Sequence, residues 1–243
     1  MHQLREAWHL IVPAADDPHG PLAPILLLLT FVTGLVDAFS YLLLGHVLVA
    51  NMTGNVVFLG FAFAGAPGFL WWASLLAIGT FLAGALVGGR LGLARGSHRG
   101  RHLLWATGAE TVLVGTALAL SLVLDRPYGN GSVVTFVTVL GIALGIQNAS
   151  ARKLAVPDLT TTVLTLMITG IASDSKAAGG SGSKIGRRVV PIVTMLLGGF
   201  VGAVLTVRGH GSVDLGIVTA VLAAAAGAAA LTARSHAPWT SPR

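Results

Sequence analysis

An aspartate inside a long apolar stretch is the residue of this chain best suited to chemistry. Asp37 lies in an apolar run over residues 24–44, long enough to cross a bilayer. An ionised carboxylate is costly in hydrocarbon, and none of the long apolar runs holds a Lys or Arg to neutralise it. Asp37 must be protonated, hydrated or bound to a cation, so it could load and release a proton or Na⁺. The alternative is an acid that only ties helices together.

The surroundings of Asp37 return in altered form later in the chain. Residues 34–38 match residues 145–149, where Asn148 stands in place of Asp37, 111 residues further on. The polar match in register predicts an internal repeat. Paired repeats of membrane proteins commonly place a transport site between them.

Two other polar groups are expected at membrane depth. Glu110 lies about eight residues into a later apolar run, where it could extend toward Arg101 or His102, or form a second proton or ion site. Gln147 offers amide groups that suit hydrogen bonds between helices. No His lies within the long runs to activate a Ser or Thr nucleophile, so neither an enzyme, a metal site nor a cofactor is predicted.

Composition places these residues in a membrane protein. Hydrophobic residues make up 54% of the 243 residues and charged residues only 10%, and the mean hydropathy is +0.81. So little polar surface could not cover a soluble globule. The net charge of +6 comes from bases that cluster between apolar runs, which indicates membrane topology and no nucleic-acid partner. The chain has no cysteine, which excludes disulfides.

Hydropathy predicts an all-α integral membrane protein with six spanning helices and two shorter segments. The shorter apolar runs cover residues 56–66 and 163–172 and are too short to span unaided. The six long runs cover residues 24–44, 68–89, 103–124, 132–150, 189–207 and 213–233.

The distribution of Lys and Arg supports six spans, because short cytoplasmic loops carry the excess of bases. With the amino terminus inside, thirteen of the fifteen bases lie on the cytoplasmic side, and Arg126 and Arg208 lie outside. Each half then has three spans and one short segment, so the halves are predicted to be inverted 3+3 repeats. The predicted parts are cytosolic tails at residues 1–21 and 234–243, and membrane repeats at residues 22–124 and 130–233.

The two short segments are predicted to be re-entrant or half-helices. Their starts also match, with Thr53-Gly54-Asn55 against Thr160-Thr161-Thr162. A half-helix beginning near Thr53 or Thr161 would direct its amino-terminal N–H groups into the bundle, which suits an anion or carboxylate. The simpler interpretation is that these polar side chains only cap the first turn.

The polar motifs resemble a known family. The stretch from Thr33 through Asn55, with its Asn-Met-Thr-Gly-Asn element, and the later stretch around Gln147 are similar to the YoaK-type family of bacterial membrane proteins, domain of unknown function 1275. The similarity covers about residues 24 to 232. It implies a multi-span protein of the bacterial cytoplasmic membrane and supplies no activity. The family's signature positions correspond to Gly34, Asp37, Asn51, Thr53, Gly54, Asn55, Gln147 and Asn148.

These observations predict a small secondary transporter or permease with a site near the midplane, between the repeats. The alternatives are a channel, an intramembrane enzyme or a non-transporting scaffold. The expected partners are the lipid bilayer and a small solute or ion, and a homo-oligomer is compatible with the sequence. The candidate substrate or ion site comprises Asp37, Asn51, Thr53, Gly54, Asn55, Glu110, Gln147, Asn148, Thr161 and Thr162.

Overall fold

The computed structural model describes residues 2–14, 17–95, 98–159, 161, 164–180, 182, 184–235 and 237–241. These residues form helices and turns, with no strand among them. The helices are α1 (His2–Ile11), α2 (Leu22–Leu43), α3 (Met52–Phe63), α4 (Trp71–Arg95), α5 (Arg99–Val123), α6 (Asn130–Leu154), α7 (Leu164–Ser173), η1 (Lys176–Ala178), α8 (Ile185–Val207), α9 (Gly211–Thr232) and η2 (Pro238–Thr240).

The six predicted spans are confirmed as helices. Within the described chain, α2, α4, α5, α6, α8 and α9 are long and apolar enough to cross a membrane, so the protein is a multi-pass protein of the lipid bilayer. Several helices extend past the apolar runs that predicted them. α6, for example, continues through Arg152 and Lys153 to Leu154, because charged residues in a last turn still reach the hydrated interface.

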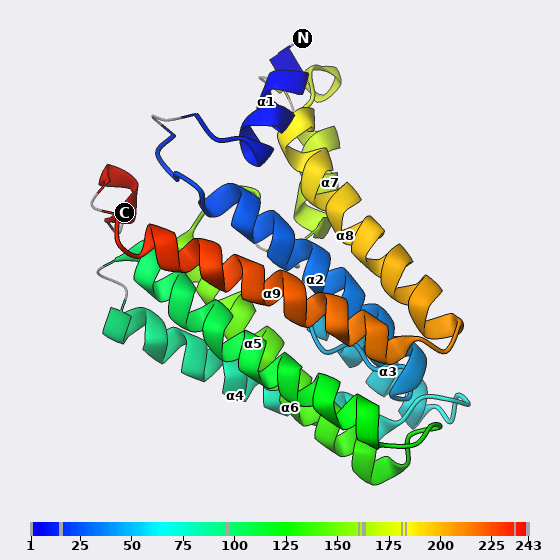
Figure 1. Cartoon of the computed structure of the whole chain (residues 1–243). Helices are drawn as coiled ribbons and strands as arrows, with labels where there is room; N and C mark the ends of the chain where they lie inside the picture. Colours follow the sequence, from blue (N-terminus) through cyan, green and yellow to red (C-terminus); the bar gives the residue numbers. More distant parts are fainter. Residues whose placement is uncertain are drawn as a thin grey trace.

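Two of the six helices form the centre of the bundle. The apolar segments of α2 and α6 are 78% and 56% buried, against 22% to 33% for the other four. α2 packs against α8 and α9, α6 packs against α4 and α5, and α5 packs against α9 (Figure 1). The lipid-facing sides of the four outer helices therefore carry exposed apolar side chains, such as Leu86, Val112 and Phe200.

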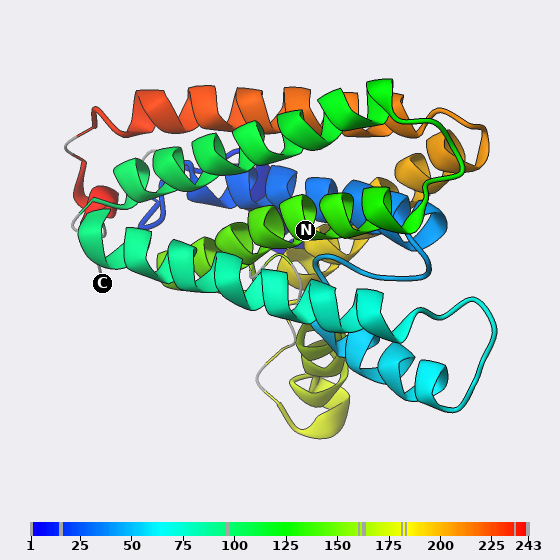
Figure 2. The same ribbon diagram turned by 90° about the horizontal axis from the view of Figure 1, so that it is seen from below.

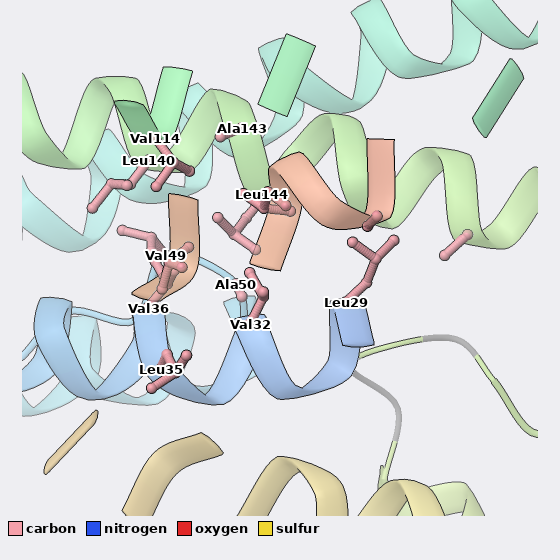
Figure 3. Close-up of a cluster of buried hydrophobic side chains, with 14 of the residues drawn as sticks. Leu29, Val32, Leu35, Val36, Val49, Ala50, Val114, Leu140, Ala143 and Leu144 are labelled. Atoms are coloured by element: carbon pink, nitrogen blue, oxygen red, sulfur yellow. The ribbon is translucent and has the colours of Figure 1, made fainter. Parts of the chain in front are cut away.

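The core between the two central helices is filled with aliphatic side chains. Figure 3 shows Val32 and Val36 of α2 facing Leu140 and Leu144 of α6. Val49 and Ala50, from the segment that follows α2, fill the space between them. This part of the molecule is a packed apolar layer.

Glycines let the central helices approach their partners closely. A Cβ added at Gly34 of α2 would lie 2.6 Å from the Gly199 nitrogen of α8. A Cβ added at Gly145 of α6 would lie 2.9 Å from the Ala85 nitrogen of α4. Real Cβ atoms do not approach other atoms so closely, so only glycine fits at either crossing. Such small-residue contacts replace the hydrophobic driving force that helices lack in lipid.

The two short helices lie outside the six-helix core. α3 packs on α4 and α7 packs on α8, and Figure 2 shows both on one side of the bundle. Helix α3 has 12 residues, so it is about 18 Å long, well short of a hydrocarbon core of about 30 Å. Neither short helix crosses a bilayer by itself.

One end of the bundle is held together by Arg99. Its guanidinium donates hydrogen bonds to the carbonyls of Leu154 and, at 3.4 Å, Trp239, and it lies 3.3 Å from His19 Nδ1. These contacts join the end of α6, the chain after α9 and the chain before α2. The segments predicted as tails are thus partly structured: α1 packs on α8, with Leu10 buried.

The opposite end is held together by Arg126. Its guanidinium donates to the Gly209 carbonyl at 2.9 Å and to Ser212 Oγ at 3.0 Å. Arg126 belongs to the α5–α6 connection, whereas Gly209 and Ser212 lie where α8 passes into α9. Arg126 therefore ties the α5–α6 connection to the α8–α9 connection.

Single cysteines should establish which end is cytosolic. Arg101 and Arg234, near the Arg99 end, and Arg208, near the Arg126 end, are exposed. We expect Arg101→Cys and Arg234→Cys to react with a membrane-impermeant maleimide only after bacterial cells are opened, and Arg208→Cys to react on intact cells. The cysteine-free parent chain is the control. Labelling of the first two variants on intact cells would contradict cytosolic termini.

Candidate functional site

The Asp37 carboxylate binds the chain that follows its own helix. Asp37 Oδ1 accepts a hydrogen bond from the Ala50 N–H at 3.0 Å, and Oδ2 accepts one from the Asn51 side-chain amide. The Asp37 residue is only 6% exposed. A carboxylate that accepts two N–H bonds is stabilised where a bare one would not be. The predicted buried acid is present, and its partners are backbone and amide groups.

Asn55 completes this arrangement from the first turn of α3. Its Oδ1 accepts from the Leu48 N–H at 2.9 Å, and its Nδ2 donates to the Leu48 carbonyl. Asn55 is fully buried and is the one buried residue of α3. Its amide therefore replaces the backbone partners that an extended segment would find in a sheet.

Asp37 and Asn55 together hold the last part of the segment between α2 and α3. Asp37 binds residues 50 and 51, and Asn55 binds residue 48. We call this set of five residues the clasp: Asp37, Leu48, Ala50, Asn51 and Asn55. The clasp connects α3 to the central helix α2 through polar contacts. The rings of Tyr41 on α2 and Phe58 on α3 add an aromatic contact, with centroids 5.7 Å apart, and α3 also packs on α4.

Two of the predicted site residues have other roles in the first half. The Thr53 side chain is exposed and lies outside the clasp. Gly54 provides space, because a Cβ there would lie 2.6 Å from the Leu48 side chain. The capping interpretation does not hold for Asn55, because both ends of its amide bond Leu48. The N-cap residue of α3 is Asn51, which makes no side-chain cap bond and donates its Nδ2 to Asp37.

The second half has a related but weaker contact. Thr161 Oγ1 lies 3.5 Å from Asn148 Oδ1, and Asn148 Nδ2 donates to the Leu144 carbonyl at 3.0 Å. Thr161 lies in the connection before α7. It is buried, and its backbone adopts the left-handed conformation with a φ of +57°. Thr162 lies outside the described residues. Asn148 thus contacts the segment before the short helix, as Asp37 does in the first half.

Gln147 links the two central helices. Its Nε2 donates to Thr33 Oγ1 of α2 at 2.8 Å and lies 3.5 Å from the Leu29 carbonyl. Its Oε1 is buried with no hydrogen-bond partner in the described chain. The expected interhelical hydrogen bond is present, and one acceptor remains open.

Glu110 is enclosed within the protein. It is 0% exposed, and neither carboxyl oxygen has a hydrogen-bond partner among the described residues. The alternative that it extends to Arg101 or His102 is therefore wrong.

Sequence reasoning missed a third buried acid, Asp214 in the first turn of α9. It is also 0% exposed, and neither of its oxygens has a partner in the part of the chain that the structure describes. The available signal was an acid just inside the run at residues 213–233. No cluster of three His, Asp or Glu suited to a metal occurs among the described residues.

An open cleft of about 510 Å³ lies at the Arg99 end of the bundle, remote from the clasp. It is bordered by α1, by the chain that leads to α2, by the α6–α7 connection and by the start of α8. Side chains of both charges line it: Glu6, Asp17, Asp158, Lys184 and Arg187.

Comparison with known proteins gives a family match and a similar curated protein. The family model described as "Protein of unknown function (DUF1275)" matches residues 25–229. The UPF0700 transmembrane protein YoaK of Bacillus subtilis (strain 168) is 30% identical over 152 residues, which cover 62% of this chain and 65% of that protein. The match thus spans slightly less than two thirds of that relative. No solved structure matches the chain.

Proposed function

Because the chain belongs to the DUF1275 family, whose description assigns no activity, we propose a function from its geometry: a small secondary transporter. Two inverted halves would rock against each other around the clasp, in a bacterial cytoplasmic membrane with both termini in the cytosol. The observation that carries this proposal is the equivalence of two helix crossings, each of which packs a central helix of one half against an outer helix of the other half.

The two crossings use equivalent atoms. The space for a Cβ at Gly34 is closed by the Met195 oxygen and the Gly199 nitrogen of α8. The space at Gly145 is closed by the corresponding atoms of α4, the Phe81 oxygen and the Ala85 nitrogen. The reverse contacts also agree: Gly198 meets the carbonyl of Phe31, and Gly84 meets the carbonyl of Ile142.

A repeat accounts for this agreement. On the central helices, Gly34 and Gly145 are 111 positions apart, as are Phe31 and Ile142. On the outer helices, the equivalent residues of α4 and α8 are 114 positions apart, for example Gly84 and Gly198. Exchanging the halves converts the packing of α2 on α8 and α9 into that of α6 on α4 and α5. It also converts α3 on α4 into α7 on α8. Three long helices per half would give the halves opposite orientations, which is the architecture of many alternating-access carriers.

The clasp supplies an element that a proton can switch. Both carboxyl oxygens of Asp37 act as acceptors. A proton on Oδ2 would point toward the Asn51 amide, so two donors would oppose each other. Protonation would then favour release of the segment that leads into α3. By linkage, release of the segment would favour proton binding.

The apolar core favours a carrier over a channel. A channel needs a continuous polar or hydrated path, whereas aliphatic side chains fill the layer between α2 and α6 (Figure 3). A scaffold would need only the glycine crossings and would not need a carboxylate at Asp37. Proton movement therefore distinguishes a scaffold from a transporter.

The proposal can be tested with proteoliposomes that contain a pH-sensitive dye. Amino acids, sugars, carboxylates and amines are added one at a time under an imposed pH gradient. We expect one class to move protons with the wild-type protein, and Asp37→Asn to lower that rate about tenfold. The matched control is Asp125→Asn, which changes an exposed acid. No response to any solute, or equal rates for the two variants, would overturn proton-coupled transport.

A further inference from the structure

The unpaired carboxyl of Glu110 has a mainly apolar environment on its own helix. Ala106, Val114 and Ala117 share the buried side of α5 with it, and the buried Thr107 hydroxyl donates to the Leu103 carbonyl. A charge without a partner in such surroundings is strongly disfavoured relative to the neutral acid. A neutral carboxyl has one O–H donor, and a buried donor needs an acceptor.

The one open acceptor on Gln147 lies at the same level of the bundle. α5 and α6 are joined by a short connection and run antiparallel (Figure 2). Val114 of α5 lies beside Leu140 and Ala143 of α6 (Figure 3). One turn from Val114 toward the start of α5 is Glu110, and one turn from Ala143 toward the end of α6 is Gln147.

We propose that Glu110 is a proton-binding site whose O–H donates to Gln147 Oε1. The remaining bonds run in one direction: Gln147 Nε2 donates to Thr33 Oγ1, and Thr33 donates to the Leu29 carbonyl at 2.9 Å. The proton on Glu110 thus completes a chain of donors that joins α5, α6 and α2. This site is separate from Asp37, and it does not depend on whether the protein transports a solute.

No charged group competes for Glu110 among the described residues. On α5 itself, His102 lies two turns away, and both it and Lys153 of α6 contact the space beside Gly92 of α4, near the end of the bundle. Asp214 of α9 lies toward the opposite end, two residues after Ser212, whose hydroxyl donates to the Ser121 carbonyl near the end of α5. On α2 the titratable group is Asp37, which is engaged in the clasp.

Infrared spectroscopy of the purified protein in lipid tests this site directly. We expect a carbonyl band of a protonated carboxylic acid at neutral pH that disappears in Glu110→Gln. In Gln147→Leu the band should persist and move to higher frequency, because the acid loses its hydrogen-bond acceptor. Asp125→Asn is the control and should leave the band unchanged.

Three results would overturn the proposal. One is a spectrum unchanged by Glu110→Gln. Another is a band that does not move in Gln147→Leu. The last is a band in sodium-free buffer that is lost when Na⁺ is added, since Na⁺ would then be the ligand.

Labelling of the wild-type protein covers the case in which the variants do not fold. A hydrophobic carbodiimide adds the O–H of a protonated carboxyl across its C=N bond, and the adduct rearranges to a stable N-acylurea without loss of atoms. We expect mass spectrometry to find this adduct on Glu110, with far less adduct from a water-soluble carbodiimide. Absence of the adduct from Glu110 would contradict a protonated acid.

Discussion

Replacing Gly145 with alanine is expected to lower the free energy of unfolding by about 3 kcal/mol, because the new methyl group meets backbone atoms. The Phe81 oxygen and the Ala85 nitrogen of α4 both lie closer than 3.0 Å to the Cβ position. Neither can move aside by changing a rotamer. The whole α4–α6 crossing would have to open, which we expect to appear as a fall of about 10 °C in Tm in detergent.

A matched substitution separates this contact from helix propensity. Gly108 lies in the middle of α5 with open space around its Cβ position. Gly108→Ala should leave Tm unchanged or raise it slightly, because alanine favours a helix by up to about 1 kcal/mol over glycine. Gly34→Ala should resemble Gly145→Ala, because its crossing is equivalent. Equal Tm values for the variants at Gly108 and Gly145 would contradict the close approach of α4 and α6.

The sequence was sufficient to predict the six spans, because the length of an apolar run directly reports what can cross a bilayer. It could not reveal that α2 and α6 occupy the centre. α8 is as apolar as α2, yet only 22% of its apolar segment is buried, against 78% for α2. In lipid the outside of a helix is as apolar as its inside, so hydropathy loses the contrast that identifies a buried face in a soluble protein.

The candidate site was predicted in part. Asp37, Asn51 and Asn55 were expected to lie together, and in the structure their side chains bond within the same short segment: Asp37 bonds Ala50 and Asn51, and Asn55 bonds Leu48. Their function in the clasp depends on an irregular segment at residues 47–51, whose path no helical or alternating pattern reports. Thr53 was included in the candidate site because its sequence neighbours are polar. Its position on α3 directs its side chain outward, so it is exposed.

The loss of the clasp is expected to have the second large effect. Asn55→Ala leaves both the N–H and the C=O of Leu48, in a partly buried segment, without their partners. Each unpaired backbone group costs about 1 to 3 kcal/mol. We therefore expect the variant to lose about 3 kcal/mol of stability, and hydrogen exchange to rise first in residues 47–63, because Asn55 is the one buried residue of α3.

Thr53→Ala is the matched control for this experiment, because it removes a polar side chain two positions away on the same helix. Thr53 is exposed, so exchange in residues 47–63 should remain at the wild-type rate. If the two variants exchanged alike, the short helix would be held by its packing on α4 and not by Asn55. If only Asn55→Ala exchanged faster while α2 and α6 stayed protected, the clasp would be a local latch. The six-helix bundle would then persist while the connection to α3 opened, as a proton-controlled release requires.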